Sequence, residues 1–129
     1  MARWKSRTLT DGELDFMKVL WKNSGATPDE IQNALHDRGR TLTGGTSRDV
    51  LAVLIEKGYV MRKKQGKTHV YSAKINKDQA MKTMAQNLLT SAFNGSESLL
   101  MNALLKNRDV RPEELDEIAL LIEKHRGRE

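Results

Sequence analysis

Two short segments of the sequence carry side chains that could bind a nucleic acid. The first, residues 43–52, combines glycines, hydroxyl side chains and a single arginine. Arg48 is a long donor that can bond to two atoms of a guanine edge, while short hydroxyl side chains suit a phosphate or a thymine methyl. The second, residues 57–67, holds five cations and no acid. Cations of this kind neutralise phosphates, so both segments indicate nucleic-acid contact.

Covalent or metal chemistry is not indicated. The three histidines, His36, His69 and His125, are far apart in the sequence and have no paired ligand spacing. The chain has no cysteine, which excludes thiolate catalysis, disulfides and cysteine-ligated metals. No nucleophile, base and orienting group come together, so we expect neither an enzyme nor a metal or cofactor site.

The first segment belongs to the third of three short predicted helices. Residues 10–13 (TDGE) and 27–30 (TPDE) are capping boxes, in which a threonine and a glutamate three residues later satisfy each other's free amides. They predict helices over residues 11–23 and from 28 to about 38. Apolar residues at helical spacing predict a third helix over residues 44–57, ended by Gly58.

The second segment falls mostly on a predicted β-hairpin. Residues 59–64 and 67–72 are β-compatible and flank Gln65-Gly66, where glycine tolerates the positive φ of a tight turn. Three more helices are predicted after it, starting near Asn76, Leu99 and Pro112. The fold class is therefore mainly α with a small β-hairpin. We expect a winged helix-turn-helix DNA-binding domain over residues 1–74 and a helical dimerisation domain over residues 75–129.

In such a fold the third helix enters the major groove and the hairpin, or wing, lies on the backbone. Val50, Leu51, Leu54 and Ile55 should face the core, which leaves the opposite face for bases. The expected base-reading residues are Gly45, Thr46, Ser47, Arg48 and Ala52. The expected phosphate and wing residues are Thr43, Gly44, Arg62, Lys63, Lys64 and Lys67, and Lys57 is counted with the wing cations. Asp49 can orient Arg48. The alternative is that Arg48 and the wing lysines are only solvated surface residues.

The charge distribution favours a polyanion as partner of the first part only. Residues 1–74 carry 14 Lys/Arg and 8 Asp/Glu, a net charge of +6, whereas residues 75–129 carry 8 and 9, a net charge of −1. No stretch is apolar enough for a membrane-spanning helix, and the first seven residues do not resemble a signal peptide. We therefore expect a cytoplasmic protein without a membrane partner.

Several segments resemble one known family. Residues 9–21 (LTDGELDFMKVLW), 26–31 (ATPDEI), 54–60 (LIEKGYV), 69–71 (HVY) and 111–118 (RPEELDEI) are similar, in order and spacing, to the penicillinase repressor family, the BlaI/MecI/CopY group. The resemblance covers about residues 9–124. It implies a winged-helix transcriptional repressor that binds palindromic operators upstream of β-lactamase, sensor-protease or copper-export genes.

The resemblance also implies a homodimer, with a sensor protease as a further partner. The implied dimerisation residues are Leu88, Leu89, Leu99, Leu100, Leu104, Leu105, Leu115, Ile118 and Ile122. Independently, three helices with so many apolar positions lack enough partner surface within one chain, unless they fold back on the winged helix.

Three departures from the family pattern stand out. The copper-responsive branch has a cysteine cluster that this chain lacks. The antibiotic-responsive branch is cleaved near an Asn-Phe bond, and residues 93–99 contain no such pair, so either cleavage occurs elsewhere or the inducing signal differs. Ser47 and Asp49 stand where an aliphatic residue and threonine are common, so the operator can differ as well.

Other functions remain open from the residues alone. A winged helix can serve as a protein-docking module without sequence-specific DNA binding. The lysine-rich wing speaks against this alternative. RNA binding ranks third because the wing offers few aromatic side chains on which exposed bases could stack. An enzyme ranks last.

Overall fold

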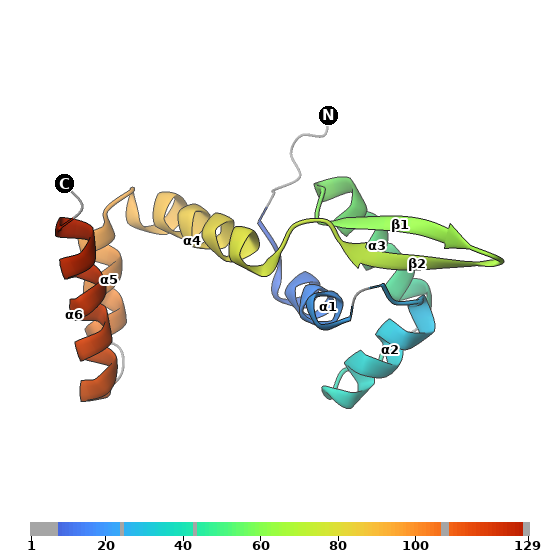
Figure 1. The fold of residues 1–129 in the computed structure, drawn as a ribbon, viewed down its shortest axis with the longest axis horizontal. Coiled ribbons are helices and arrows are strands. Elements are labelled where there is room, and N and C mark those ends of the chain that lie inside the picture. The colour runs from blue at the N-terminus through green and yellow to red at the C-terminus, as the bar shows by residue number, and fades with distance from the viewer. Residues whose placement is uncertain (1–7, 24, 43, 107–108, 128–129) are drawn as a thin grey trace. The chain divides into compact units, whose positions relative to one another are not determined.

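The computed structural model describes residues 8–23, 25–42, 44–106 and 109–127. Within these ranges the chain forms six helices and one two-stranded antiparallel hairpin (Figure 1). The elements are α1 (Asp11–Lys22), α2 (Pro28–Asp37), α3 (Gly44–Lys57), β1 (Val60–Gln65), β2 (Thr68–Ala73), α4 (Lys77–Phe93), α5 (Glu97–Lys106) and α6 (Pro112–Arg126). The predicted order of three helices, a hairpin and three helices is confirmed.

Both capping boxes are present. The amide of Glu13 donates to the Oγ1 of Thr10 at 3.1 Å, and the amide of Thr10 donates to the Oε1 of Glu13 at 2.9 Å. Thr27 and Glu30 make the same reciprocal pair at the start of α2. These side chains satisfy amides that a helix start leaves free, so α1 and α2 begin where the sequence predicts.

The hairpin closes one residue later than predicted. Gln65 pairs with Thr68, so the two-residue turn consists of Gly66 and Lys67, and Gly66 has a φ of 61°. Ala26 also forms a bridge to Tyr71, with both backbone hydrogen bonds present. This bridge fixes the base of the hairpin to the loop between α1 and α2.

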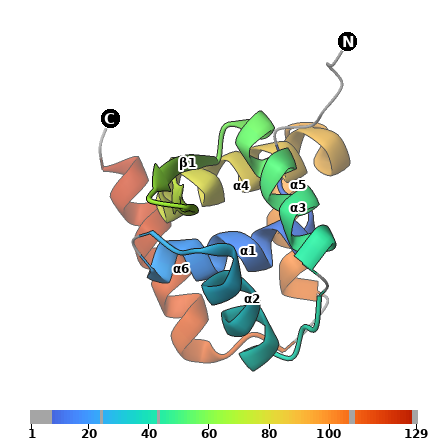
Figure 2. The same ribbon diagram turned by 90° about the vertical axis from the view of Figure 1, so that its right-hand side faces the viewer.

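The chain divides into two compact units, residues 1–87 and 88–129, and the boundary falls inside α4. Unit 1 has one hydrophobic core, to which α1, α2, α3 and the hairpin all contribute. Figure 2 views the hairpin nearly end-on, with α1 and α2 below it and α3 beside it. The largest side chains that are completely buried are Phe16, Met17, Ile31, Leu35, Leu51 and Leu54. Ala80 of α4 is also fully buried, so the first turns of α4 belong to this unit.

Unit 2 contains the end of α4 together with α5 and α6. Neither α5 nor α6 has a buried residue in the single chain. No helix in the described ranges is both long and apolar enough to cross a membrane.

Candidate nucleic-acid interface

The outer face of α3 is available to a ligand. Leu51 and Leu54 are fully buried, and Val50 and Ile55 pack against them, so the inner face lies where the sequence predicts. The opposite face of the helix is exposed. It consists of Gly45, Thr46, Arg48, Asp49 and Ala52. Four of these five are predicted base-reading residues.

Ser47, the fifth predicted base-reading residue, lies elsewhere. The residue is only 1% exposed, and its hydroxyl has no hydrogen-bond partner among the described residues. Ser47 precedes Leu51 by four positions and Leu54 by seven, so helical spacing turns it toward the core. It cannot present its hydroxyl to a base edge, and we remove it from the base-reading set.

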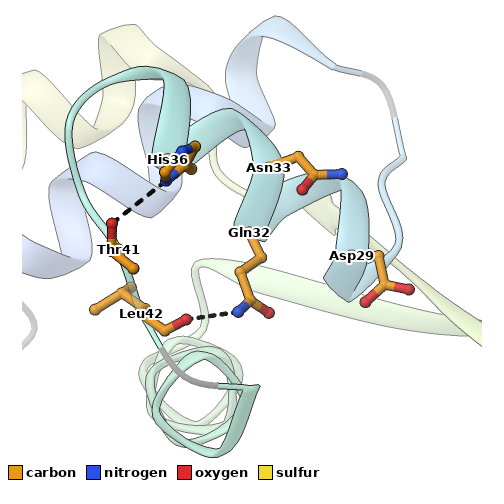
Figure 3. A pocket seen from close by; sticks show the side chains of 6 residues that line it. All are labelled: Asp29, Gln32, Asn33, His36, Thr41 and Leu42. Atoms are coloured by element: carbon orange, nitrogen blue, oxygen red, sulfur yellow. Dashed lines mark hydrogen bonds between the residues drawn. The ribbon is translucent and has the colours of Figure 1, made fainter.

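Two side chains of α2 hold the connection that leads into α3. Figure 3 shows Gln32 and His36 on α2 facing this connection. The Nε2 of Gln32 donates to the carbonyl oxygen of Leu42 at 2.5 Å, and the Nδ1 of His36 lies 3.3 Å from the Oγ1 of Thr41. These bonds restrict the path of the chain just before α3 begins. Of the two predicted phosphate contacts at this point, Thr43 lies outside the described residues, while Gly44 is the first residue of α3.

The hairpin and α3 share one surface. The strand register places Arg62 opposite Tyr71, and cross-strand partners lie on the same face of a sheet. Because Tyr71 is buried, this face of the hairpin is turned toward the body of the unit. A hollow of about 440 Å³ is lined by Arg62 and Tyr71 together with Arg48, Asp49, Ala52 and Ile55 of α3. The predicted recognition helix and the wing thus form one continuous surface carrying two arginines and one carboxylate.

The tip of the hairpin is cationic and open to solvent. Lys63, Lys64 and Lys67 are all exposed, as is Arg62. The alternation along β1 directs Arg62 and Lys64 to one face and Lys63 to the other. A cationic tip of this kind can follow a phosphate backbone.

Lys57 is not part of this cationic surface, contrary to the sequence prediction. It is the last residue of α3, and its Nζ donates to the Oε1 of Glu13 at 2.7 Å and to the carbonyl oxygen of Thr8 at 3.1 Å. The side chain is only 7% exposed. Its partner is 44 positions away, so no local pattern in the sequence reveals the pair.

Unit 2 exposes many large apolar side chains. Of the nine predicted dimerisation residues, Leu89 is buried, and Leu100 and Ile118 are partly buried. The other six are 41–53% exposed: Leu88, Leu99, Leu104, Leu105, Leu115 and Ile122. Leu120 and Leu121, which were not in the predicted set, are 63% and 56% exposed. Leu121 follows Ile118 by three positions, so helical spacing could have placed it on the predicted apolar face. Leu120 has no apolar residue three or four positions away, so the sequence contains no such indication for it.

No cluster of three or more potential metal-ligating side chains occurs in the part of the chain that the structure describes.

The chain is similar to known proteins over most of its length. The family model for the penicillinase repressor matches residues 9–124. A protein of Bacillus licheniformis named penicillinase repressor is 28% identical over 120 residues, which cover 93% of each chain. The methicillin resistance regulatory protein MecI of Staphylococcus aureus is 20% identical over 93% of this chain and 97% of its own.

Two solved structures have a fold similar to that of this chain. The DNA-binding domain of the repressor BlaI is 32% identical and has a TM-score of 0.51, covering 58% of this chain and 90% of that domain. RosR of H. salinarum is 17% identical with a TM-score of 0.53, covering 94% of this chain and 99% of its own, and shows a shared fold only.

Proposed function

Because this chain belongs to the penicillinase repressor family, we propose that it is a transcriptional repressor that binds pseudo-palindromic operator DNA as a homodimer. The regulated genes would be of the β-lactamase or sensor-protease type, or related stress genes. The relatives are named as a repressor and a regulatory protein, so the proposal includes no catalytic step. A protein that binds operator DNA in this way would act in the cytoplasm.

The surface shared by α3 and the hairpin is the single observation that carries the DNA-binding proposal. Arg48 and Arg62 line one hollow from two different elements. With the exposed start of α3 in the major groove, Arg48 would bond to a guanine edge, and the hairpin would follow the adjoining phosphates. Gly45, Thr46 and Ala52 would accompany Arg48 at the bases. Thr43, Gly44, Arg62 and the three tip lysines would contact the backbone.

The exposed leucines of unit 2 support the homodimer. Eight large apolar side chains of this unit are more than 40% exposed in the single chain. Exposed apolar side chains in such number usually mark an interaction site, and a two-fold dimer is the commonest way to cover them. In functional terms we divide the chain at 74/75, with DNA binding in residues 1–74 and dimerisation in residues 75–129. A two-fold dimer would present two copies of α3 about 34–36 Å apart, or at a multiple of that spacing.

A sensor protease is a further proposed partner, by analogy with the antibiotic-responsive branch of the family. Incubating the protein with such a protease and mapping the products by mass spectrometry would test this. We expect cleavage at a peptide bond other than Asn-Phe, since residues 93–99 contain no Asn-Phe pair. An uncut chain would instead favour a different inducing signal.

Selection from random double-stranded DNA at about 150 mM salt, where non-specific binding is weak, tests the proposed function. We expect one sequence with two-fold symmetry to be enriched. Arg48→Ala should then weaken binding to that site by about 5- to 150-fold, the equivalent of one bidentate base contact. Arg126→Ala removes the same charge from α6 and serves as the matched control. Enrichment of no sequence would favour the protein-docking alternative.

Sedimentation of the free protein tests the dimer separately. We expect the wild type to sediment as a dimer, and the double variant Leu104→Glu, Leu115→Glu as a monomer, because four buried charges would face each other across the interface. A wild-type protein that sediments as a monomer at micromolar concentration would contradict the dimer. That result would not contradict the proposed DNA contacts of unit 1, which the selection experiment tests separately.

A further inference from the structure

A second concave site lies in unit 1, apart from the surface described above. It is a pocket of about 290 Å³ lined by Lys18, Trp21 and Lys22 of α1, Arg38 at the end of α2 and Lys77 at the start of α4. No residue of α3 or the hairpin lines it. We call these five residues the basic pocket. In Figure 1, α4 starts on the side of α1 that is opposite to the hairpin tip, so the basic pocket does not continue the proposed DNA surface.

The charges in the basic pocket are all of one sign. Four of its five lining residues are cations and none is an acid. Within the described ranges, none of these four cations makes an ion pair or side-chain hydrogen bond. In the same unit, Arg40 is paired with Asp15 and Lys57 with Glu13. The four cations come from three separate elements and are exposed, so their charges can attract an anion that enters the pocket.

The remaining lining residue, Trp21, provides an apolar wall. Its indole Nε1 donates to the carbonyl oxygen of Ile75 at 2.9 Å, and the side chain is partly buried. The hydrogen bond joins α1 to the segment just before α4, which sets the position of the ring beside Lys77. Pockets that hold small molecules usually combine an apolar wall with a few convergent polar groups.

We infer that the basic pocket binds a small molecule with at least two anionic groups, such as a phosphate ester or a dicarboxylate. The volume of the basic pocket is just below the range usual for ligand pockets, so it suits a ligand that is smaller than most. Four cations allow two separate anionic groups to be held at once. The site is distinct from the DNA-binding surface, and the inference does not depend on the proposed function.

Fluorescence of Trp21 gives a direct measurement. The only other tryptophan is Trp4, so a Trp4→Phe variant of the full chain reports on Trp21 alone. We would titrate it with pyrophosphate and, separately, with citrate, and use sodium chloride at equal ionic strength as the reference. We expect a saturable fluorescence change with at least one of the two anions and none with chloride. The anion that saturates at lower concentration distinguishes a phosphate ligand from a carboxylate ligand. Parallel changes with all three salts would mean charge screening and would overturn the inference.

Two double variants separate the pocket from the overall charge. Lys18→Gln with Lys22→Gln removes two charges from the basic pocket, and Lys63→Gln with Lys64→Gln removes two from the hairpin tip. We expect the first pair to weaken anion binding at least tenfold and the second to leave it unchanged. Equal weakening by both pairs would overturn the inference. So would a loss of DNA binding by the first pair as large as that by the second, because the pocket would then be a backbone contact.

Discussion

The Nζ of Lys57 lies 2.7 Å from the Oε1 of Glu13, and the two side chains are only 7% and 11% exposed. The same Oε1 accepts the amide of Thr10, and the same Nζ donates to the carbonyl of Thr8. A single ion pair therefore joins the end of α3 to the start of α1. It connects the proposed recognition helix to the body of unit 1 at the end remote from the bases.

Replacing Lys57 by methionine should lower the free energy of unfolding by about 3–5 kcal/mol, because it leaves the carboxylate of Glu13 buried without its partner. The double variant Lys57→Met, Glu13→Gln should recover most of this loss. It removes both charges and keeps a side chain that can complete the capping box. Chemical denaturation at one fixed protein concentration measures both values. Lys64→Met, at an exposed site, is the control and should change stability by less than about 0.5 kcal/mol. If Lys57→Met were as stable as this control, the ion pair would not stabilise the fold as proposed.

Ser47→Ala should stabilise the protein by about 1–2 kcal/mol. The hydroxyl of Ser47 is buried without a hydrogen-bond partner among the described residues, and alanine is the better helix former. Thermal unfolding measures the gain. Affinity for the selected operator should stay within twofold, since the side chain does not reach the surface. A large loss of affinity with unchanged stability would return Ser47 to the base-reading set.

Gly45→Ala should change stability and DNA binding in opposite directions. Gly45 lies in α3, and a Cβ there would meet nothing within 4 Å, so alanine should stabilise the helix by about 0.5–1 kcal/mol. Because the proposal places Gly45 against the bases, the added methyl group should weaken operator binding by about tenfold. Denaturation and fluorescence anisotropy with labelled operator measure the two effects. Gly25→Ala is the contrast. Gly25 has a φ of 93° and a Cβ would lie 3.0 Å from Val70, so that variant should be less stable.

Lys63→Gln with Lys64→Gln should weaken binding to every DNA sequence by a similar factor. Each phosphate contact contributes roughly 0.9 to the slope of log affinity against log salt, so the slope should fall by about 1.8. Affinity measured between 50 and 200 mM salt gives this slope for specific and unrelated DNA. Lys18→Gln with Lys22→Gln makes the same change in net charge and should leave the slope unaltered. An unchanged slope in the hairpin variant would show that the tip does not contact DNA.

Local signals in the sequence were sufficient for most of the fold. The two capping boxes act between residues three positions apart, so the starts of α1 and α2 could be predicted without tertiary information. Gly58, with a φ of 88°, likewise marks the end of α3. Ser47 was misplaced because the prediction followed apolar residues only, although its spacing from Leu51 and Leu54 pointed inward. The partner of Lys57 and the gathering of cations around Trp21 depend on contacts between distant segments, which sequence periodicity does not report.

The outer half of the hairpin has an evolutionary consequence. Residues 63–68 are all exposed, and the turn between the strands needs only Gly66 and one further residue. Substitutions in this stretch remove little packing, so they should rarely be eliminated for causing misfolding. A lineage could therefore change the proposed DNA contact at the tip without first acquiring a compensating change in the core. Such freedom would let related regulators diverge in affinity while the folded domain stays the same.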